Sequence, residues 1–317
     1  MSIIPLRGKQ KYWRQNNMIY TVTFNPALDY VMLLNKFESG GVNRSKEEFL
    51  NPGGKGINVS MMLTELEVDN TALGYVAGFT GEELVNKLKK RNIKTDFITL
   101  KEGNTRINVK VKADIESEIN AGGPDITNED INLLMSKLDK LSDEDILVLA
   151  GSIPSSVDND IYEQIMKRLN DKKVNIAVDA TNELLLNVLK YSPFLIKPNH
   201  HELGELFDVS LKTEEDIITY AKKLQEMGAR NILVSMAGDG AILLTENGEI
   251  LKSNSPKGKV INSVGAGDSM VAGFLAGYLK NKDYTEALKL GIASGSASAF
   301  SEGIATKKDV DTLLKQL

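Results

Sequence analysis

The sequence lacks residues on which several common kinds of protein depend. It has no cysteine, which excludes disulfide bonds and thiolate metal sites, and nothing marks it as secreted. Its two histidines, His200 and His201, are adjacent, so a Ser-His-Asp hydrolase or a zinc site with several histidines is hard to build. No third ligand stands near them, so we expect a helix-surface or turn position for both. A cytoplasmic protein is the expectation.

Long apolar runs and long basic blocks are also missing. No run approaches the roughly 20 apolar residues that a membrane helix needs, so we expect no membrane partner. The net charge is −5, from 38 basic and 43 acidic residues, and it does not suggest a nucleic-acid partner. The net charge does not exclude small anionic substrates, because the charge of a local site need not follow the net charge of the protein.

The first residues differ in composition from the rest. Residues 1–17 carry basic side chains and no acidic ones, and they lack the apolar core of a secretory signal. A clear strand pattern begins directly after Met18. We therefore expect a disordered leader or a start-site artefact over 1–17 and a single domain over 18–317.

From Met18 onward, short apolar runs alternate with longer amphipathic ones. Several short runs are apolar throughout, as in strands that are buried on both faces. Strand, helix and strand in repetition predict an α/β fold whose parallel sheet is covered on both faces. The predicted strands are 19–24, 71–76, 146–150, 174–178, 194–196 and 232–235. The predicted helices are 57–66, 82–91, 128–141, 159–170, 214–227, 266–280, 284–301 and 307–316.

Two stretches break this rhythm and alternate polar with apolar residues, as hairpin strands do. They pair 31–34 with 47–50 and 105–111 with 116–121. Their placement predicts a small β-lid, formed by about 31–51 and 105–121, that projects from the main sheet.

One face of the predicted lid carries polar side chains. Arg106, Asn108 and Lys110 fall on this face by the period of two, and together they could grip a phosphate. Asn120 on the neighbouring strand could reach the same ligand. The alternative is a solvated face of an edge strand.

A Gly-Ala-Gly-Asp turn, residues 265–268, leads into a long apolar helix. Unpaired N–H groups at a helix start favour an anion, and glycine lets the backbone approach a phosphate closely. Asp268 in the first turn could accept a proton from a substrate hydroxyl, as the base does in phosphoryl transfer. The alternative is that Asp268 caps the helix and the glycines only tighten a turn.

A second glycine-rich segment, Asn51-Pro-Gly-Gly-Lys-Gly-Ile-Asn58, precedes a helix. Backbone donors around Gly53 and Gly54 could wrap a sugar, Lys55 offers charge to a phosphate, and Asn58 could bond a hydroxyl. The spacing is not that of a Walker A loop. A plain strand-to-helix turn is the alternative.

Two further polar segments follow predicted strands, where ligands bind in open parallel sheets. Asp29 follows the first strand and could accept hydrogen bonds from sugar hydroxyls, or serve as a capped turn. In Lys197-Pro-Asn-His-His-Glu202, Asn199 and Glu202 share a face if a helix begins there. One carboxylate and one amide suffice for Mg²⁺, which usually keeps several waters.

Together these segments resemble the ribokinase-like carbohydrate kinases, in the same order along nearly the whole chain. The resemblance implies a three-layer α/β sandwich with a β-lid, Mg²⁺ with ATP as phosphoryl donor, and Asp268 as catalytic base. It implies that Glu202 contacts Mg²⁺, directly or through water, and that a homodimer forms through the lid. The anion hole would be Gly265, Ala266, Gly267 and Asp268. The nucleotide would also meet Lys197, Asn199, Ser235, Gly238, Gly240, Ser263 and Val264.

Within the family, Thr105-Arg-Ile-Asn-Val-Lys110 and Ser235-Met-Ala-Gly-Asp-Gly240 are similar to the branch that phosphorylates fructose 1-phosphate at the 6-hydroxyl. The resemblance then implies that Lys55, Arg106 and Lys110 surround the phosphate, and that Asp29, Gly54, Asn58 and Asn108 hold the sugar. Many members have an acidic residue and a threonine where this chain has Asn262 and Ser263, so no monovalent-cation activation is predicted.

Three alternatives are weighed against this hypothesis. A tagatose-6-phosphate kinase would share the architecture and differ only in the acceptor pocket. A non-catalytic sugar-phosphate sensor would have lost the base or the anion hole, and both are present. A nucleotide-dependent dehydrogenase would need GxGxxG after the first strand, where Asn-Pro-Ala-Leu-Asp29 stands instead.

Overall fold

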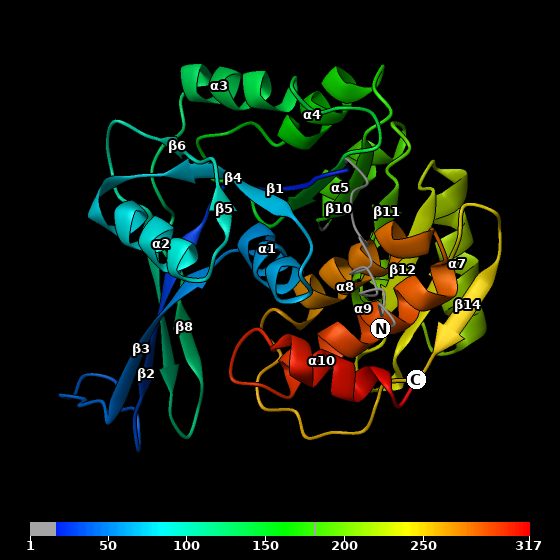
Figure 1. The fold of residues 1–317 in the computed structure, drawn as a ribbon. Coiled ribbons are helices and arrows are strands. Elements are labelled where there is room, and N and C mark those ends of the chain that lie inside the picture. The colour runs from blue at the N-terminus through cyan, green and yellow to red at the C-terminus, as the bar shows by residue number, and fades with distance from the viewer. Residues whose placement is uncertain (1–16, 181) are drawn as a thin grey trace, which may run out of the picture.

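A mostly parallel sheet forms the centre of the molecule in the computed structural model, which describes residues 17–180 and 182–317 (Figure 1). Neighbouring strands pair in parallel except β13 and β14, which add an antiparallel edge. In spatial order the strands are β14 (Ile250–Ser253), β13 (Ala241–Leu244), β12 (Asn231–Ser235), β11 (Leu195–Ile196), β10 (Asn175–Asp179), β9 (Ile146–Ala150), β1 (Ile19–Thr23), β4 (Asn70–Val76) and β5 (Lys94–Thr95), and β6 (Ile98–Thr99) also pairs with β4.

Helices cover both faces of this sheet, so the predicted three-layer α/β architecture is confirmed. One face packs against α3 (Asn128–Leu138), α4 (Ile161–Leu169), α5 (Asn182–Leu189), α6 (His200–Leu206) and α7 (Glu214–Glu226). The other packs against α1 (Lys55–Glu65), α8 (Ala266–Asn281), α9 (Tyr284–Ala299) and α10 (Lys307–Leu314). The remaining helix, α2 (Gly78–Lys90), belongs to a smaller cluster with α1 and β4 beside the lid.

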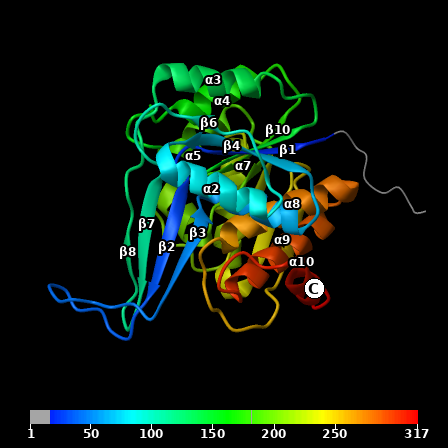
Figure 2. The same ribbon diagram turned by 60° about the vertical axis from the view of Figure 1, so that its left-hand side comes forward.

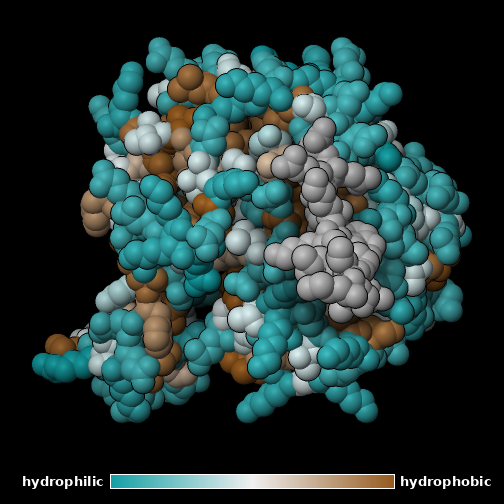
Figure 3. Space-filling view, viewed as in Figure 1, coloured by the Kyte–Doolittle hydropathy of each residue, from teal (hydrophilic) through white to brown (hydrophobic). Residues whose placement is uncertain are grey.

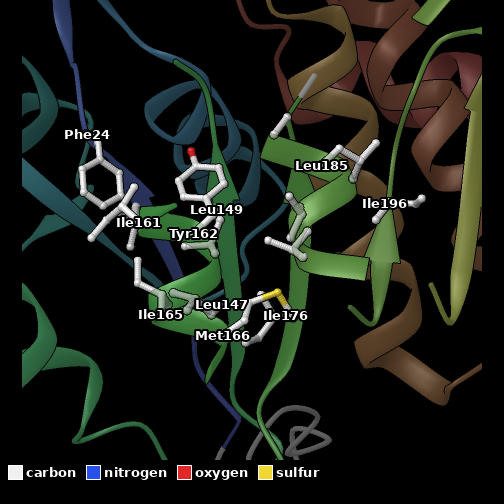
Figure 4. Close-up of a cluster of buried hydrophobic side chains, with 14 of the residues drawn as sticks. Phe24, Leu147, Leu149, Ile161, Tyr162, Ile165, Met166, Ile176, Leu185 and Ile196 are labelled. Atoms are coloured by element: carbon white, nitrogen blue, oxygen red, sulfur yellow. The ribbon is translucent and has the colours of Figure 1, made fainter. Parts of the chain in front are cut away.

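Strand β9 explains why the central strands are apolar throughout. Its side chains alternate between the two helical layers, with Leu147 and Leu149 in one core cluster and Ile146 and Val148 in the other. Figure 4 shows the first cluster, in which Leu149 lies beside Tyr162 and Leu147 beside Met166. A strand buried on both faces needs no polar alternation.

A second, four-stranded sheet forms the lid and projects from the body (Figure 2). Its order is β3 (Glu47–Gly53), β2 (Ala27–Leu33), β7 (Arg106–Lys112) and β8 (Ser117–Ile119). The two predicted hairpin pairs are present as β2–β3 and β7–β8, both antiparallel. The parallel pairing of β2 with β7 joins them, and the sequence pattern did not predict it.

Short elements escaped the sequence analysis. The edge strands β13 and β14, the two-residue strands β5 and β6, the helix α5 and the 3₁₀ turn η1 (Ala237–Asp239) were not predicted. Of the predicted leader 1–17, only Asn17 falls among the described residues, and the division into a leader and one domain stays a prediction. None of the helices in the described ranges combines the length and the apolar character that crossing a bilayer requires.

Candidate active site

Asp268 lies in the first turn of α8. Gly265 precedes the helix with a φ of 81°, in the left-handed region that favours glycine. Because Gly265 holds the N-cap position and no side chain caps α8, Asp268 is not the cap of the helix. Asp268 is 5% exposed, and Nδ2 of Asn58 on α1 donates a 2.8 Å hydrogen bond to its Oδ2. The carboxylate is thus oriented by a neighbouring helix.

Backbone N–H groups of the same turn are open to an anion. The N–H of Ala266 donates to the carbonyl of Ser263 at 3.2 Å. Those of Gly265, Gly267 and Asp268 have no acceptor within the part of the chain that the structure describes. Unpaired donors and the positive end of the helix dipole both favour negative charge here. The turn therefore offers three open donors.

Asp179, at the end of β10, joins two lysines next to Asp268. Nζ of Lys55 lies 3.4 Å from Oδ2 of Asp179, and Nζ of Lys197 lies 3.4 Å from Oδ1. A Cβ built on Gly267 would lie 3.3 Å from Nζ of Lys197, so this ammonium group also faces the anion-binding turn. A buried carboxylate thus fixes two cations beside the carboxylate of Asp268.

These surroundings push the pKa values of the two carboxyl groups apart. Burial, and then the charge of Asp179, raises the pKa of Asp268 to about 6, although the Asn58 hydrogen bond and both lysines act in the opposite direction. Burial also disfavours ionised Asp179, but Lys197 and Lys55 outweigh it and hold the pKa of Asp179 below its ordinary value. A carboxylate with a pKa near neutrality, beside one that stays ionised, suits acid–base chemistry.

The lid contributes a second polar cluster, centred on Asp29 of β2. Nδ2 of Asn108, its register partner on β7, donates a 2.9 Å hydrogen bond to Oδ1 of Asp29. Nζ of Lys110 lies 3.5 Å from Oδ2. A Cβ on Gly53 would come within 2.7 Å of this carboxylate, so only glycine leaves room for it. Asn108 and Lys110 both reach Asp29, as expected for one face of the strand.

A cavity of about 440 Å³ separates this cluster from the body, a volume suited to a small ligand. The space-filling view shows a hollow between the lid and the C-terminal helices (Figure 3). The lining comes from lid and body alike and includes Asp29, Phe49, Lys110, Asn58, Arg91, Val264 and Ile304. The cavity therefore connects the Asp29 cluster with Asn58, the hydrogen-bond partner of Asp268.

Six residues that were predicted to bind the acceptor do not line this cavity, namely Gly53, Gly54, Lys55, Asn108, Arg106 and Asn120. Arg106 donates from Nε to the carbonyl of Asn25 at 3.1 Å and from Nη1 to that of Ala121 at 3.4 Å. Asn120 is exposed beyond the end of β8. Of the predicted acceptor-binding residues, the structure brings Asp29, Asn58 and Lys110 together in the lining and leaves the other six outside it.

The residues predicted to meet a nucleotide follow β11 and β12. Lys197 and Asn199 come after β11, and Asn199 forms an isolated parallel bridge with Ser235 at the end of β12. Gly238 lies in η1, and Gly240 directly follows it. In the segment before α8, Ser263 accepts the Ala266 bond, whereas Val264 lines the cavity on the lid side.

Asn199 and Glu202 form a capping box at the start of α6. Oδ1 of Asn199 accepts from the N–H groups of His201 and Glu202, both at 2.9 Å, and Oε2 of Glu202 accepts from the N–H of Asn199 at 2.7 Å. The negative charge of Glu202 also contributes to raising the pKa of Lys55. No group of three or more His, Asp or Glu side chains arranged to hold a metal ion occurs in residues 17–180 and 182–317.

Sequence reasoning missed Asp179. The residue directly follows the predicted strand 174–178, at the carboxyl edge of the sheet, and the same rule had selected Asp29. What the sequence did not reveal is that β10 and β11 are neighbours, which brings Asp179 and Lys197 together.

Comparison with known proteins identifies the class. Residues 22–311 match the pfkB family of carbohydrate kinases, and the chain belongs to this family. It is 49% identical over 300 residues to 1-phosphofructokinase of Bacillus subtilis (strain 168), covering 95% of this chain and 98% of the relative. It is 37% identical over 301 residues to D-tagatose-1-phosphate kinase of Bacillus licheniformis, with coverage of 95% and 98%.

A solved structure agrees with this assignment. Phosphofructokinase-2 from Escherichia coli, in complex with fructose-6-phosphate, matches with a TM-score of 0.88 and 26% identity, covering 95% of this chain and 99% of that chain. The protein is therefore a carbohydrate kinase with a ribokinase-like fold, as the resemblance implied.

Proposed function

We propose that the protein transfers the γ-phosphoryl group of ATP to the 6-hydroxyl of fructose 1-phosphate, giving fructose 1,6-bisphosphate and ADP. The observation that carries the proposal is the buried carboxylate of Asp268, oriented by Asn58 beside three open N–H donors. The 49% identity to a protein named 1-phosphofructokinase supports the choice of acceptor.

In this reaction Asp268 accepts the proton of the 6-hydroxyl. The hydroxyl oxygen bonds to the γ-phosphorus, and the bond from that phosphorus to the bridging oxygen of ADP breaks. The open N–H groups of Gly265, Gly267 and Asp268 would stabilise the charge on the transferring oxygens. Lys197, held by Asp179 against Gly267, would add a positive charge on the donor side.

Glu202 is the carboxylate that we assign to Mg²⁺. Only its Oε2 is engaged in the capping box, and its charge already acts on Lys55. Mg²⁺ commonly takes one or two protein carboxylates and fills its other positions with water and substrate phosphates, so these oxygen donors fit it. Bound with ATP, the ion would neutralise charge on the β- and γ-phosphates.

The acceptor would occupy the cavity under the lid. Asp29 and Asn58 line it and offer hydrogen bonds to sugar hydroxyls. Asn108 would act through its hydrogen bond to Asp29, and Gly53 leaves room for the Asp29 carboxylate. We assign Lys110 as a contact of the phosphate, because it lines the cavity and Arg106 does not. The positive charge of Lys55 acts on the carboxyl group of Asp268. Lys55 would therefore contact the transferring phosphoryl group.

A second acceptor, tagatose 1-phosphate, is favoured by the 37% identity to a D-tagatose-1-phosphate kinase. It differs from fructose 1-phosphate only in the configuration at C4. A coupled ADP-release assay separates the candidates, with Mg²⁺-ATP and fructose 1-phosphate, tagatose 1-phosphate, tagatose 6-phosphate or fructose 6-phosphate as sole acceptor. We expect the highest kcat/KM with fructose 1-phosphate; a higher value with another ketose phosphate would reassign the acceptor, and no reaction with any would leave the non-catalytic sensor.

We also propose a homodimer formed through the lids. On the lid face opposite Asp29, Tyr30 lies in register with Leu50 and Val109, and Val109 with Ile119, so an apolar row crosses all four strands. Ile119 is 66% exposed, which supports a second copy as its cover. Sedimentation should give a dimer for the unchanged protein and a monomer for Ile119→Glu, and a monomeric unchanged protein would contradict the proposal.

A further inference from the structure

Three cations line the cavity under the lid, Arg91, Lys110 and Lys112. Arg91, the C-cap residue of α2, lines the cavity together with Asp29, Asn58 and Lys110. It ends the predicted helix 82–91, and the sequence analysis assigned it no role in binding.

Arg91 lines the same cavity as Asn58, the hydrogen-bond partner of Asp268. Asn58 contacts Asp268, and Met61, which also lines the cavity, lies three residues further along α1, about 4.5 Å along the helix axis. Met61 belongs to the same buried cluster as Leu88 and Ile93, which flank Arg91 in sequence. An acceptor whose hydroxyl meets Asp268 would therefore extend toward Arg91.

The other cations in the lining already have carboxylate partners. Nζ of Lys110 lies 3.5 Å from both Asp29 and Glu118, and Nζ of Lys112 lies 4.0 Å from Glu116. The side chain of Arg91 forms no ion pair or hydrogen bond with any residue in 17–180 and 182–317. Its guanidinium group is exposed, and its donors are open to a ligand.

Helix polarity alone would account for a cation here, because positive charge is favoured at the end of a helix. Lys89 and Lys90 meet that requirement at the same end of α2, and neither lines the cavity. Arg91 differs from them in position, and its planar group can bind a phosphate through two parallel hydrogen bonds.

We propose that Arg91 is a specificity-determining residue that binds the phosphate of the acceptor in the cavity under the lid. This inference rests on the proposed function, since it requires a phosphorylated acceptor. Arg91 touches neither Asp268 nor the open N–H turn, so it contributes to binding in the ground state and the transition state alike. Such an interaction changes KM and leaves kcat unaltered.

The test compares Arg91→Gln, Arg91→Lys and the matched control Lys90→Gln, with fructose 1-phosphate as acceptor. Loss of a hydrogen-bonded charge should raise the KM for fructose 1-phosphate about tenfold in Arg91→Gln. The kcat and the KM for Mg²⁺-ATP should stay unchanged. Arg91→Lys should recover part of the loss, because it keeps the charge without the planar fork, and Lys90→Gln should match the unchanged protein.

The test distinguishes a failure of the role proposed for Arg91 from a failure of the proposed function. If the unchanged protein turns over fructose 1-phosphate and Arg91→Gln has the same KM, the role of Arg91 is overturned and the proposed function stands. If the unchanged protein phosphorylates no ketose phosphate, the proposed function fails and the role of Arg91 fails with it. Equal rises of KM in Arg91→Gln and Lys90→Gln would indicate a general effect of surface charge, and would also overturn the inference.

Discussion

Two groups of charged residues flank the proposed reaction centre, and the group on the lid is the more exposed of the two. On the body, Asp268, Asp179 and Lys197 are all buried. On the lid, Lys110 bridges Asp29 and Glu118, and the side chain of Glu118 is 46% exposed. Charges in a poorly hydrated site interact strongly, whereas exposed pairs contribute little. The body therefore holds its charged groups in fixed positions for the chemical step. On the lid, Lys110 can give up a carboxylate partner and bind the acceptor instead.

The largest effect is expected from the body, in Asp268→Asn. The amide cannot accept the hydroxyl proton, so kcat should fall by roughly 10² to 10⁴. The amide oxygen can still accept the Asn58 hydrogen bond, so ATP affinity and the circular dichroism spectrum should be preserved. The measurement is ADP release at saturating acceptor. A kcat within tenfold of the unchanged protein would remove Asp268 from the role of base.

Asp179→Asn should lower the free energy of unfolding, because it breaks the buried charge pairs of the body. It leaves the buried ammonium group of Lys197 and that of Lys55 without their carboxylate, which costs about 3–5 kcal/mol of unfolding free energy. Urea unfolding at neutral pH measures the loss. The control is Asp139→Asn, which breaks an exposed pair with Arg168 and should change little. Equal stability of both variants would contradict the role given to burial.

The raised pKa of Asp268 predicts how stability depends on pH. In the unfolded chain the group ionises near 3.8, and in the folded protein it ionises at about 6, so folding disfavours the ionised form. Its contribution to stability is therefore lost as pH rises from about 4 to 6. Asp268→Asn lacks this loss. Its free energy of unfolding should therefore exceed that of the unchanged protein by about 3 kcal/mol at pH 7, and by little at pH 4. A difference that does not change with pH would contradict the shift.

The smallest effect is expected on the lid, in Lys110→Gln. Because Lys110 already has two carboxylate partners, replacing it should raise the KM for fructose 1-phosphate only about fivefold. The kcat should stay within about twofold, since Lys110 does not contact Asp268. Steady-state kinetics with varied acceptor measures both constants. A large fall in kcat with unchanged KM would show that the lid takes part in the chemical step.

Much of the fold could be predicted from the sequence because its signals are local. The central strands are apolar on both faces, as β9 illustrates, and the long helices α8 and α9 have continuous patterns. The turn at Gly265 and the alternation of Asn108 with Lys110 were also local signals. Elements of two residues, such as β5, are too short to show any period.

The contacts that define the candidate site could be predicted only in part. That Asn58 meets Asp268, 210 positions later, depends on the packing of α1 against α8, which no local pattern encodes. The pairing of Asp179 with Lys197 depends on strand order, and the position of Arg91 depends on where α2 ends relative to the lid. For Arg106, the period of two along the strand was predicted correctly. The sequence could not show that its guanidinium group donates hydrogen bonds to the carbonyls of Asn25 and Ala121.

The central claim is that the protein moves a phosphoryl group from ATP to the 6-hydroxyl of fructose 1-phosphate. Phosphorus NMR of a mixture of the protein, Mg²⁺-ATP and fructose 1-phosphate tests it most directly. The account predicts a new phosphomonoester signal from C6 of the sugar, growing in equal amount with ADP while the C1 phosphate is retained. Formation of ADP with inorganic phosphate and no second sugar phosphate, or no reaction at all, would contradict it.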